Sequence, residues 1–334
     1  MLRYFGFSGL LTVAAVAATL IAAGPAAALT VMVLIAIEIA FSFDNAIINA
    51  KVLERLSGLW QQLFLTLGMV IAILGMRLVF PILIVMVTAH LPWRQVIDEA
   101  LHQPALYSSH LSAAHVTIAA FGGAFLLTLA LYFLFDDARK VLWLKQPERQ
   151  LQRLGGNFWL PPLIVAAVVG LAGWTSGQHS HTVWRAGLIG AVSYAAIKLL
   201  IDGLGKLEPE AKRHYTGWNA LLAFLYLEVL DASFSFDGVL GAFAITSKVL
   251  LIVLGLGVGA IWVRSLTVYM VRRGLLKSYI FLEHGAHYAI LVLAAALLSS
   301  IFYNVPEVVT GVTGLGVIIA SFVASRQALR AKKM

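Results

Sequence analysis

The stretch Glu38-Ile-Ala-Phe-Ser-Phe-Asp-Asn-Ala-Ile-Ile-Asn-Ala-Lys51 decides the fold, because it sets acidic and amide side chains inside one of the most apolar parts of the chain. The preceding residues, from Tyr4 to Ile37, contain no Asp, Glu, Lys or Arg. Glu38, Asp44 and Asn45 then follow closely. A charge at the centre of a bilayer costs at least about 2.5 kcal/mol, so such residues are functional candidates.

The composition of the whole chain indicates a polytopic membrane protein. Its 334 residues are 60% hydrophobic and only 12% charged, with a mean hydropathy of +0.89, whereas soluble domains are about half apolar and a quarter charged. The net charge of +8 comes from basic residues in short loops between apolar runs, where they set orientation, so no nucleic-acid partner is expected. The absence of cysteine excludes disulfides, thiolate metal sites and cysteine nucleophiles.

The apolar runs predict an all-α fold with about ten transmembrane helices. Each run is close to the roughly 20 residues that a helix needs to cross the hydrocarbon. Gly24-Pro25 divides the first long run, because proline ends a helix and glycine permits the turn. The predicted spans are 5–23, 27–50, 62–89, 116–135, 158–173, 184–204, 218–242, 249–271, 285–303 and 305–324.

Loop charge predicts the orientation of these spans. The basic loop at 136–157 is placed in the cytoplasm, and alternation then puts most other Lys and Arg residues on that side. Both termini are therefore predicted to be cytoplasmic, in a bacterial cytoplasmic (inner) membrane. Residues 1–28 also resemble a secretory signal, and their cleavage stays an open alternative. The segment 90–115 is an outer-side insertion rich in histidine, which is either a polar surface segment or a place of metal capture.

A pair of helices occurs twice in the chain. Phe-Ser-Phe-Asp recurs at 41–44 and 234–237, and Gly68 and Arg77 have the same spacing as Gly255 and Arg264. The copies lie five predicted spans apart and so cross in opposite senses, which predicts an inverted-topology repeat of the kind found in secondary transporters. The chain is thus expected to form a single membrane domain, 1–334. Its halves are 1–157 and 158–334, with repeat cores 27–89 and 218–273.

The repeated helices carry polar stripes. Glu38, Ser42, Asn45 and Asn49 share one helix face, and so do Glu228, Asp231 and Ser235. Asp44 lies about 120° from Glu38 on a regular helix. Either each Asp faces a different neighbour, or the helix unwinds near Ser-Phe-Asp so that the carboxylates converge.

The partners of these acids decide whether the stripes bind an ion. If Arg77 and Arg264 pair with Asp44 and Asp237, then Glu38, Glu228 and Asp231 lack cationic partners and need a bound cation. Carboxylate, amide and hydroxyl oxygens suit Mg²⁺, Ca²⁺ or Mn²⁺, and Na⁺ or protons could use the same site.

These motifs resemble those of the TerC family, named for tellurium resistance, within the lysine-exporter-like membrane proteins. That family carries Glu-x-x-Leu-Ser-x-Asp-Asn and Glu-x-x-Asp-x-x-Phe-x-x-Asp-Ser. Here the motifs read Glu38-Ile-Ala-Phe-Ser-Phe-Asp-Asn45 and Glu228-Val-Leu-Asp-Ala-Ser-Phe-Ser-Phe-Asp-Gly238, with Phe41 for Leu and Gly238 for Ser. The resemblance covers 38–80 and 225–290 and implies manganese export. The metal-pathway residues that it implies are Glu38, Asp44, Asn45, Glu228, Asp231 and Asp237, with Ser42, Asn49, Arg77, Ser235 and Arg264 supporting or gating.

The resulting prediction is a divalent metal cation transporter that exports Mn²⁺ by alternating access. Its expected partners are the lipid bilayer and metal ions, a homodimer is one possible assembly, and no permanent cofactor is expected, with Mn²⁺ or Ca²⁺ as transported substrate. Three alternatives stay open: a Ca²⁺ or Na⁺/H⁺ type cation exchanger, an intramembrane metal-dependent enzyme, and a stress-complex scaffold in which all acids are paired. No His-Glu-x-x-His or Gly-x-Ser-x-Gly motif occurs, so the chain is not predicted to be an enzyme.

Overall fold

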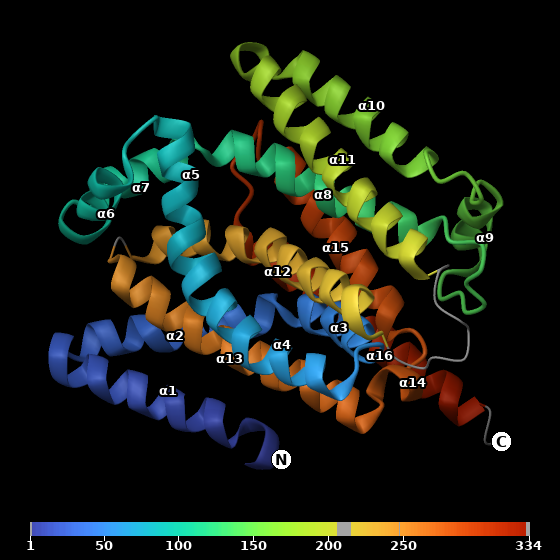
Figure 1. Cartoon of the computed structure of the whole chain (residues 1–334), viewed down its shortest axis with the longest axis horizontal. Coiled ribbons are helices and arrows are strands. Elements are labelled where there is room, and N and C mark those ends of the chain that lie inside the picture. The colour runs from blue at the N-terminus through green and yellow to red at the C-terminus, as the bar shows by residue number, and fades with distance from the viewer. Residues whose placement is uncertain (1, 206–214, 247, 332–334) are drawn as a thin grey trace. The chain divides into compact units, whose positions relative to one another are not determined.

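A computed structural model describes residues 2–205, 215–246 and 248–331. In these ranges helices are the only regular elements, apart from an isolated bridge between Leu56 and Tyr215, so the predicted all-α class is confirmed (Figure 1). The chain divides into two compact units, of which unit 1 is Met1–His115 with His214–Arg273, and unit 2 is Val116–Arg213 with Gly274–Met334. The predicted single membrane domain and its halves, 1–157 and 158–334, rest on the sequence repeat and stay predictions.

Unit 1 is built around a long helix, α13 (Val249–Arg273), which packs against the N-terminal helices and a π-helix. Figure 1 shows α13 in orange beside the blue N-terminal helices. The unit contains α1 (Leu2–Ala23), α2 (Pro25–Phe41), α3 (Phe43–Leu53), α4 (Gly58–Val70), the π-helix η1 (Ile71–Val79), α5 (Phe80–Ala89), α6 (Trp93–His102), α7 (Pro104–Ala113), α12 (Gly217–Ile245) and α13.

The segment that carries Glu38 is broken. Pro25 begins α2, where its missing N–H costs nothing, and Gly24 before it has a φ of 84° that favours glycine. The helix stops at Phe41, and α3 leaves at an angle of 54° after Ser42. The helix is therefore bent near Ser-Phe-Asp in the first copy, whereas a convergence of Glu38 and Asp44 stays a prediction. In the second copy, α12 continues as one helix through Ser235.

Apolar side chains hold these elements together on both sides of the polar stripe. Leu53, Phe64 and Leu227 belong to a buried cluster that joins α3, α4 and α12. Val31 and Val258 belong to a second cluster, between α2 and α13. Complete burial of each such side chain contributes about 1.5–3 kcal/mol relative to exposure in water.

Unit 2 consists of the remaining helices. Helix pairs α10·α11 and α15·α16 pack closely within it. Small residues permit this approach, since a Cβ on Gly187 would lie 2.6 Å from a methyl group of Val169. The helices are α8 (His115–Leu134), α9 (Lys145–Arg153), α10 (Leu160–Thr175), a 3₁₀ turn η2 (Gly177–His179), α11 (Ser180–Gly205), α14 (Leu275–Ser278), α15 (Leu282–Ser299) and α16 (Glu307–Ala331).

All ten predicted spans fall on helices. Seven helical segments in the described ranges are long and apolar enough to cross a membrane, or eight if α2 and α3 form one bent span. The shorter apolar helix α10 and the acidic helix α12 lie outside this set. The chain is thus consistent with a multi-pass membrane protein, whereas the count of ten, the inverted repeat and the orientation stay predictions. The insertion 90–115 forms α6 and α7.

Candidate functional site

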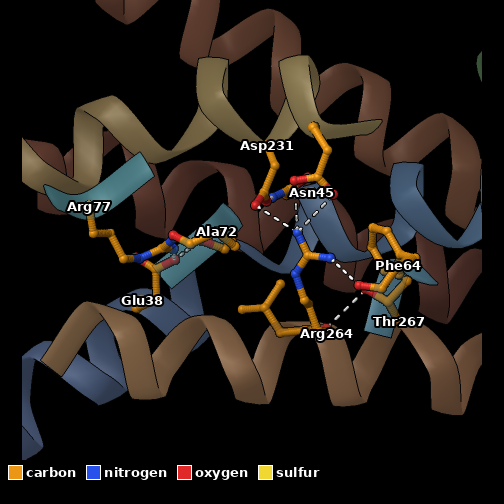
Figure 2. A network of polar contacts seen from close by, with 11 residues as sticks. Glu38, Asn45, Phe64, Ala72, Arg77, Asp231, Arg264 and Thr267 are labelled. Atoms are coloured by element: carbon orange, nitrogen blue, oxygen red, sulfur yellow. Dashed lines mark hydrogen bonds and ion pairs between the residues drawn. The ribbon is translucent and has the colours of Figure 1, made fainter. Parts of the chain in front are cut away.

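The polar residues of the repeat meet inside unit 1, in two groups that Figure 2 shows side by side. The first group surrounds Arg77, on η1. One of its terminal nitrogens, Nη2, donates to Oε1 of Glu38, and the other, Nη1, donates to the carbonyl oxygen of Ala72 at 2.6 Å. Ser42 Oγ, at the helix break, also donates to Glu38 Oε1, at 3.2 Å. Glu38 and Arg77 thus form a buried ion pair between α2 and η1.

The second group surrounds Arg264, on α13. Its Nη2 lies 3.4 Å from Glu228 Oε1 and 3.3 Å from Asp231 Oδ2, so one guanidinium serves two carboxylates of α12. Its Nη1 donates to the carbonyl oxygen of Phe64 on α4 at 2.7 Å, and the guanidinium carbon lies 4.2 Å from the centre of the Phe64 ring. Planar guanidinium groups are suited to such combined hydrogen bonding and stacking.

The helix α3 contributes amide and carboxylate groups beside the second group. Asn45 Nδ2 donates to Asp231 Oδ1 at 2.6 Å, and the backbone N–H of Asn45 donates to Asp44 Oδ1 at 2.8 Å. Asn45 and Asn49 are 2% and 1% exposed. Among the described residues, nothing donates a hydrogen bond to Oδ1 of either side chain. Two buried amide oxygens on one helix face are therefore available to a ligand or to water.

Glycines permit this close packing, and this part of the site was missed by the sequence reasoning. A Cβ on Gly68 would lie 2.5 Å from Arg264 Nη1 and 2.6 Å from Glu228 Oε1. A Cβ on Gly259 would lie 2.5 Å from Glu38 Cβ. In the sequence, Gly68 indicates only the repeat. Gly259 carries no sequence signal beyond the small residues that recur along α13.

The two copies contribute equivalent positions to the contacts. Alignment on Phe-Ser-Phe-Asp equates Glu38 with Asp231 and Asn45 with Gly238, and the Gly–Arg spacing equates Arg77 with Arg264. Each acid pairs with the arginine of its own copy. Asn45 bonds Asp231, and in the reverse direction a Cβ on Gly238 would lie 3.4 Å from Glu38 Oε2. Asn45 of the first copy thus lies beside Asp231 of the second, and Gly238 of the second copy lies beside Glu38 of the first.

The prediction that three of the acids lack cationic partners is wrong. Glu38, Glu228 and Asp231 were expected to lack cationic partners, and each of them lies beside an arginine. In the first copy the bend at Ser42 changes the direction of Asp44 relative to Glu38. In the second copy Glu228 and Asp231 lie about one turn apart on the unbroken α12, so both reach the same guanidinium. In the described ranges, no three His, Asp or Glu side chains are grouped so that they could hold a metal ion. The side chains of Ser235 and Asp237 lie outside the described residues, and the metal role of the site stays a prediction.

Comparison with known proteins adds one match. A family model described as a protein of unknown function, DUF475, matches residues 43–332. No curated protein and no solved structure matches the chain. The assignment to TerC is therefore wrong, because the family whose model covers most of the chain is a different one. The roles that were carried over from TerC lose that support, and the candidate site rests on its own geometry.

Proposed function

The chain belongs to the family of proteins of unknown function DUF475, and from the geometry of its buried polar site we propose that it is a cation transporter. The proposed substrate is a hard divalent cation that crosses the bacterial cytoplasmic membrane by alternating access. Manganese is not singled out among these cations, because only the resemblance to TerC favoured it over the others. Both termini are proposed to be cytoplasmic, in accordance with the basic loops.

The observation that carries the proposal is an imbalance of buried charge. Among the described side chains of the site, the carboxylates are Glu38, Asp44, Glu228 and Asp231, and the guanidinium groups are Arg77 and Arg264. Carboxylates therefore exceed guanidinium groups, although every one of these side chains is buried. An uncompensated charge in such surroundings is costly, so the surplus calls for bound protons or a bound cation.

The ligand atoms favour a hard cation. The described site residues of α3 and α12 offer carboxylate and amide oxygens, and Oδ1 of both Asn45 and Asn49 has no donor among the described residues. Oxygen ligands of this kind suit Ca²⁺, Mg²⁺ or Mn²⁺. Exchange of Na⁺ or protons at the same carboxylates is the alternative within the transporter class.

Alternating access is supported by the different shapes of the two copies. In the first copy the acidic helix is broken at Ser42 and its partner contains the π-helix η1, whereas α12 and α13 are unbroken. Arg77 bonds the carbonyl of Ala72 in its own helix, whereas Arg264 reaches Phe64 in the other copy. In transporters built from inverted repeats, one half moves against the other around a fixed site. We infer that exchange of these two shapes between the copies opens the site to the other side.

The proposal is tested by transport in vesicles that contain the purified full-length chain. Uptake is measured for Mn²⁺, Ca²⁺ and Mg²⁺, each in competition with Na⁺ and at several proton gradients. Glu38→Gln and Asp231→Asn are expected to abolish uptake of the preferred ion. Asp202→Asn, at a carboxylate that is 47% exposed on α11, is the matched control and is expected to transport normally. Unchanged uptake in both site variants would refute the proposal.

A non-transporting scaffold is the second candidate, and a specific observation favours it. Glu38, Glu228 and Asp231 each lie beside an arginine, as a purely structural network would require. The scaffold predicts that no cation stabilises the purified chain and that vesicles with and without the chain take up cations equally. The transport assay therefore separates the two candidates.

A further inference from the structure

Unit 2 contains a short helix, α9, that is fixed by one buried carboxylate. Glu148 is fully buried, and its Oε1 accepts hydrogen bonds from the backbone N–H of Leu144 at 2.9 Å and from the Tyr288 hydroxyl at 3.2 Å. Its Oε2 lies 3.2 Å from Nη2 of Arg139. Since Tyr288 belongs to α15, this carboxylate holds α9 against a membrane-type helix.

Neighbouring groups complete this attachment. His284 Nε2, also on α15, lies 2.9 Å from the Val141 carbonyl oxygen and 3.4 Å from Glu148 Oε2. The Arg139 guanidinium lies 4.2 Å from the centre of the Phe133 ring. Burial lowers the pKa of Arg139, and the adjacent Glu148 carboxylate counteracts that effect. The inner face of α9 is therefore held in one position.

The other face of α9 concentrates positive charge. Lys145, Arg149 and Arg153 are spaced four residues apart, so they form one row along about 12 Å of helix, and all three are exposed. Like charges four residues apart destabilise a helix, and a helix of nine residues is marginal even without them. The row is therefore a concentration of exposed positive charge that attracts anions.

The surroundings of the row identify the anions. In the chain, α9 follows α8, which is long and apolar enough to span a membrane, and precedes the apolar helix α10. Leu144, Leu154 and Trp159 next to it are 44%, 56% and 58% exposed, so apolar and aromatic side chains accompany the basic row. Tryptophan is typical of the headgroup level, and basic segments beside membrane helices attract anionic lipids. We propose that the outer face of α9 binds the headgroups of anionic phospholipids.

This inference is independent of the transport proposal, because it uses residues of unit 2 alone. The test uses the full-length chain in a neutral detergent and a fluorescent phosphatidylglycerol as the probe, with phosphatidylcholine and inorganic phosphate as competitors. The triple variant Lys145→Gln/Arg149→Gln/Arg153→Gln is expected to weaken phosphatidylglycerol binding roughly hundredfold, at about fivefold per basic residue. Phosphatidylcholine and inorganic phosphate are expected not to compete.

The matched control removes the same charge from exposed positions elsewhere, in Arg94→Gln/Arg185→Gln/Lys248→Gln, and is expected to bind as the parent does. Equal weakening by both triple variants would overturn the inference, because net charge alone would then explain binding. Competition by inorganic phosphate would overturn it in favour of a small-anion site, and failure of the parent chain to bind phosphatidylglycerol would also overturn it. If the triple variant does not fold, Arg149→Gln alone decides, with an expected fivefold loss.

Discussion

The ion pair between Glu38 and Arg77 offers the sharpest test of the buried site. Glu38 is 5% exposed, and Arg77 Nη2 donates to its Oε1. In Arg77→Gln this carboxylate would lose its guanidinium and keep only the hydroxyl of Ser42 among the described donors. Removal of one partner from a buried pair costs about 3–5 kcal/mol, because the remaining charge stays buried without compensation. We expect Arg77→Gln to lower the free energy of unfolding by that amount.

A double-mutant cycle isolates the pair. Glu38→Gln alone leaves the guanidinium of Arg77 without its carboxylate, whereas Glu38→Gln/Arg77→Gln removes both charges. The double variant should therefore be much more stable than the sum of the single effects predicts, with a coupling energy near 3 kcal/mol, the upper end for residues in contact. The free energy of unfolding is measured for the full-length chain by titration with a denaturing detergent in mixed micelles.

An exposed ion pair in the same chain serves as the control. Lys198 Nζ and Asp202 Oδ2 are 3.0 Å apart, one helical turn from each other, with side chains that are 31% and 47% exposed. Its cycle, from Lys198→Gln and Asp202→Asn, is expected to give a coupling of about 0.3–0.5 kcal/mol. Equal coupling energies in the two cycles, or an Arg77→Gln variant as stable as Lys198→Gln, would refute the reasoning.

Three further predictions concern stability, each measured as a melting temperature. Gly68→Ala is expected to destabilise the chain by about 1–3 kcal/mol, since the new Cβ would lie 2.5 Å from Arg264 Nη1. Its control Gly170→Ala, where nothing lies within 4 Å of the new Cβ, should stabilise the chain by up to about 1 kcal/mol. A change of the same sign in both variants would contradict this packing. Asn45→Ala removes the 2.6 Å hydrogen bond to Asp231 and is expected to lower the stability by about 1.5–3 kcal/mol. A smaller loss of stability than in Thr30→Ala, which removes an exposed hydroxyl, would contradict this prediction. Glu148→Gln leaves the Arg139 guanidinium without its carboxylate and should lower the stability by about 3 kcal/mol. Asp98→Asn, at a carboxylate that is 59% exposed, should lower it by less than about 0.5 kcal/mol. Similar melting temperatures of the two variants would show that Glu148 does not fix α9.

The helical class and the positions of the helices follow from the sequence, because an apolar run of about 20 residues matches a helix that crosses a membrane. The predicted spans fall on helical segments, although 27–50 is divided between α2 and α3, and the division at Gly24-Pro25 separates α1 from α2. The burial of Glu38, Asn45 and Asn49 agrees with the predicted polar stripe, but the bend at Ser42 places Glu38 on a different helix from the two amides. The family could not be predicted correctly, because two short motifs do not distinguish one family from another.

The pairing of charges could not be predicted, because spacing fixes directions around one helix and says nothing about neighbours. Arg77 and Arg264 have equal spacing from Gly68 and Gly255, yet η1 is a π-helix and the corresponding part of α13 is an α-helix. The wider turns of η1 change the direction of Arg77 relative to Gly68. The carbonyl oxygens of Ala72 and Phe64, which both accept bonds from the arginines, carry no side-chain signal at all.

The interruption at Ser42 also restricts how unit 1 can move. At this break Ser42 keeps both of its helical backbone bonds, whereas the backbone N–H of Asn45 donates to Asp44 Oδ1 instead of a helical carbonyl, and hydrocarbon chains would offer such a group no replacement partner. Exposure of this junction to lipid tails would therefore be unfavourable. Any rearrangement must keep α12 and α13 over it, so these helices would have to slide or roll across the first copy and could not part from it sideways.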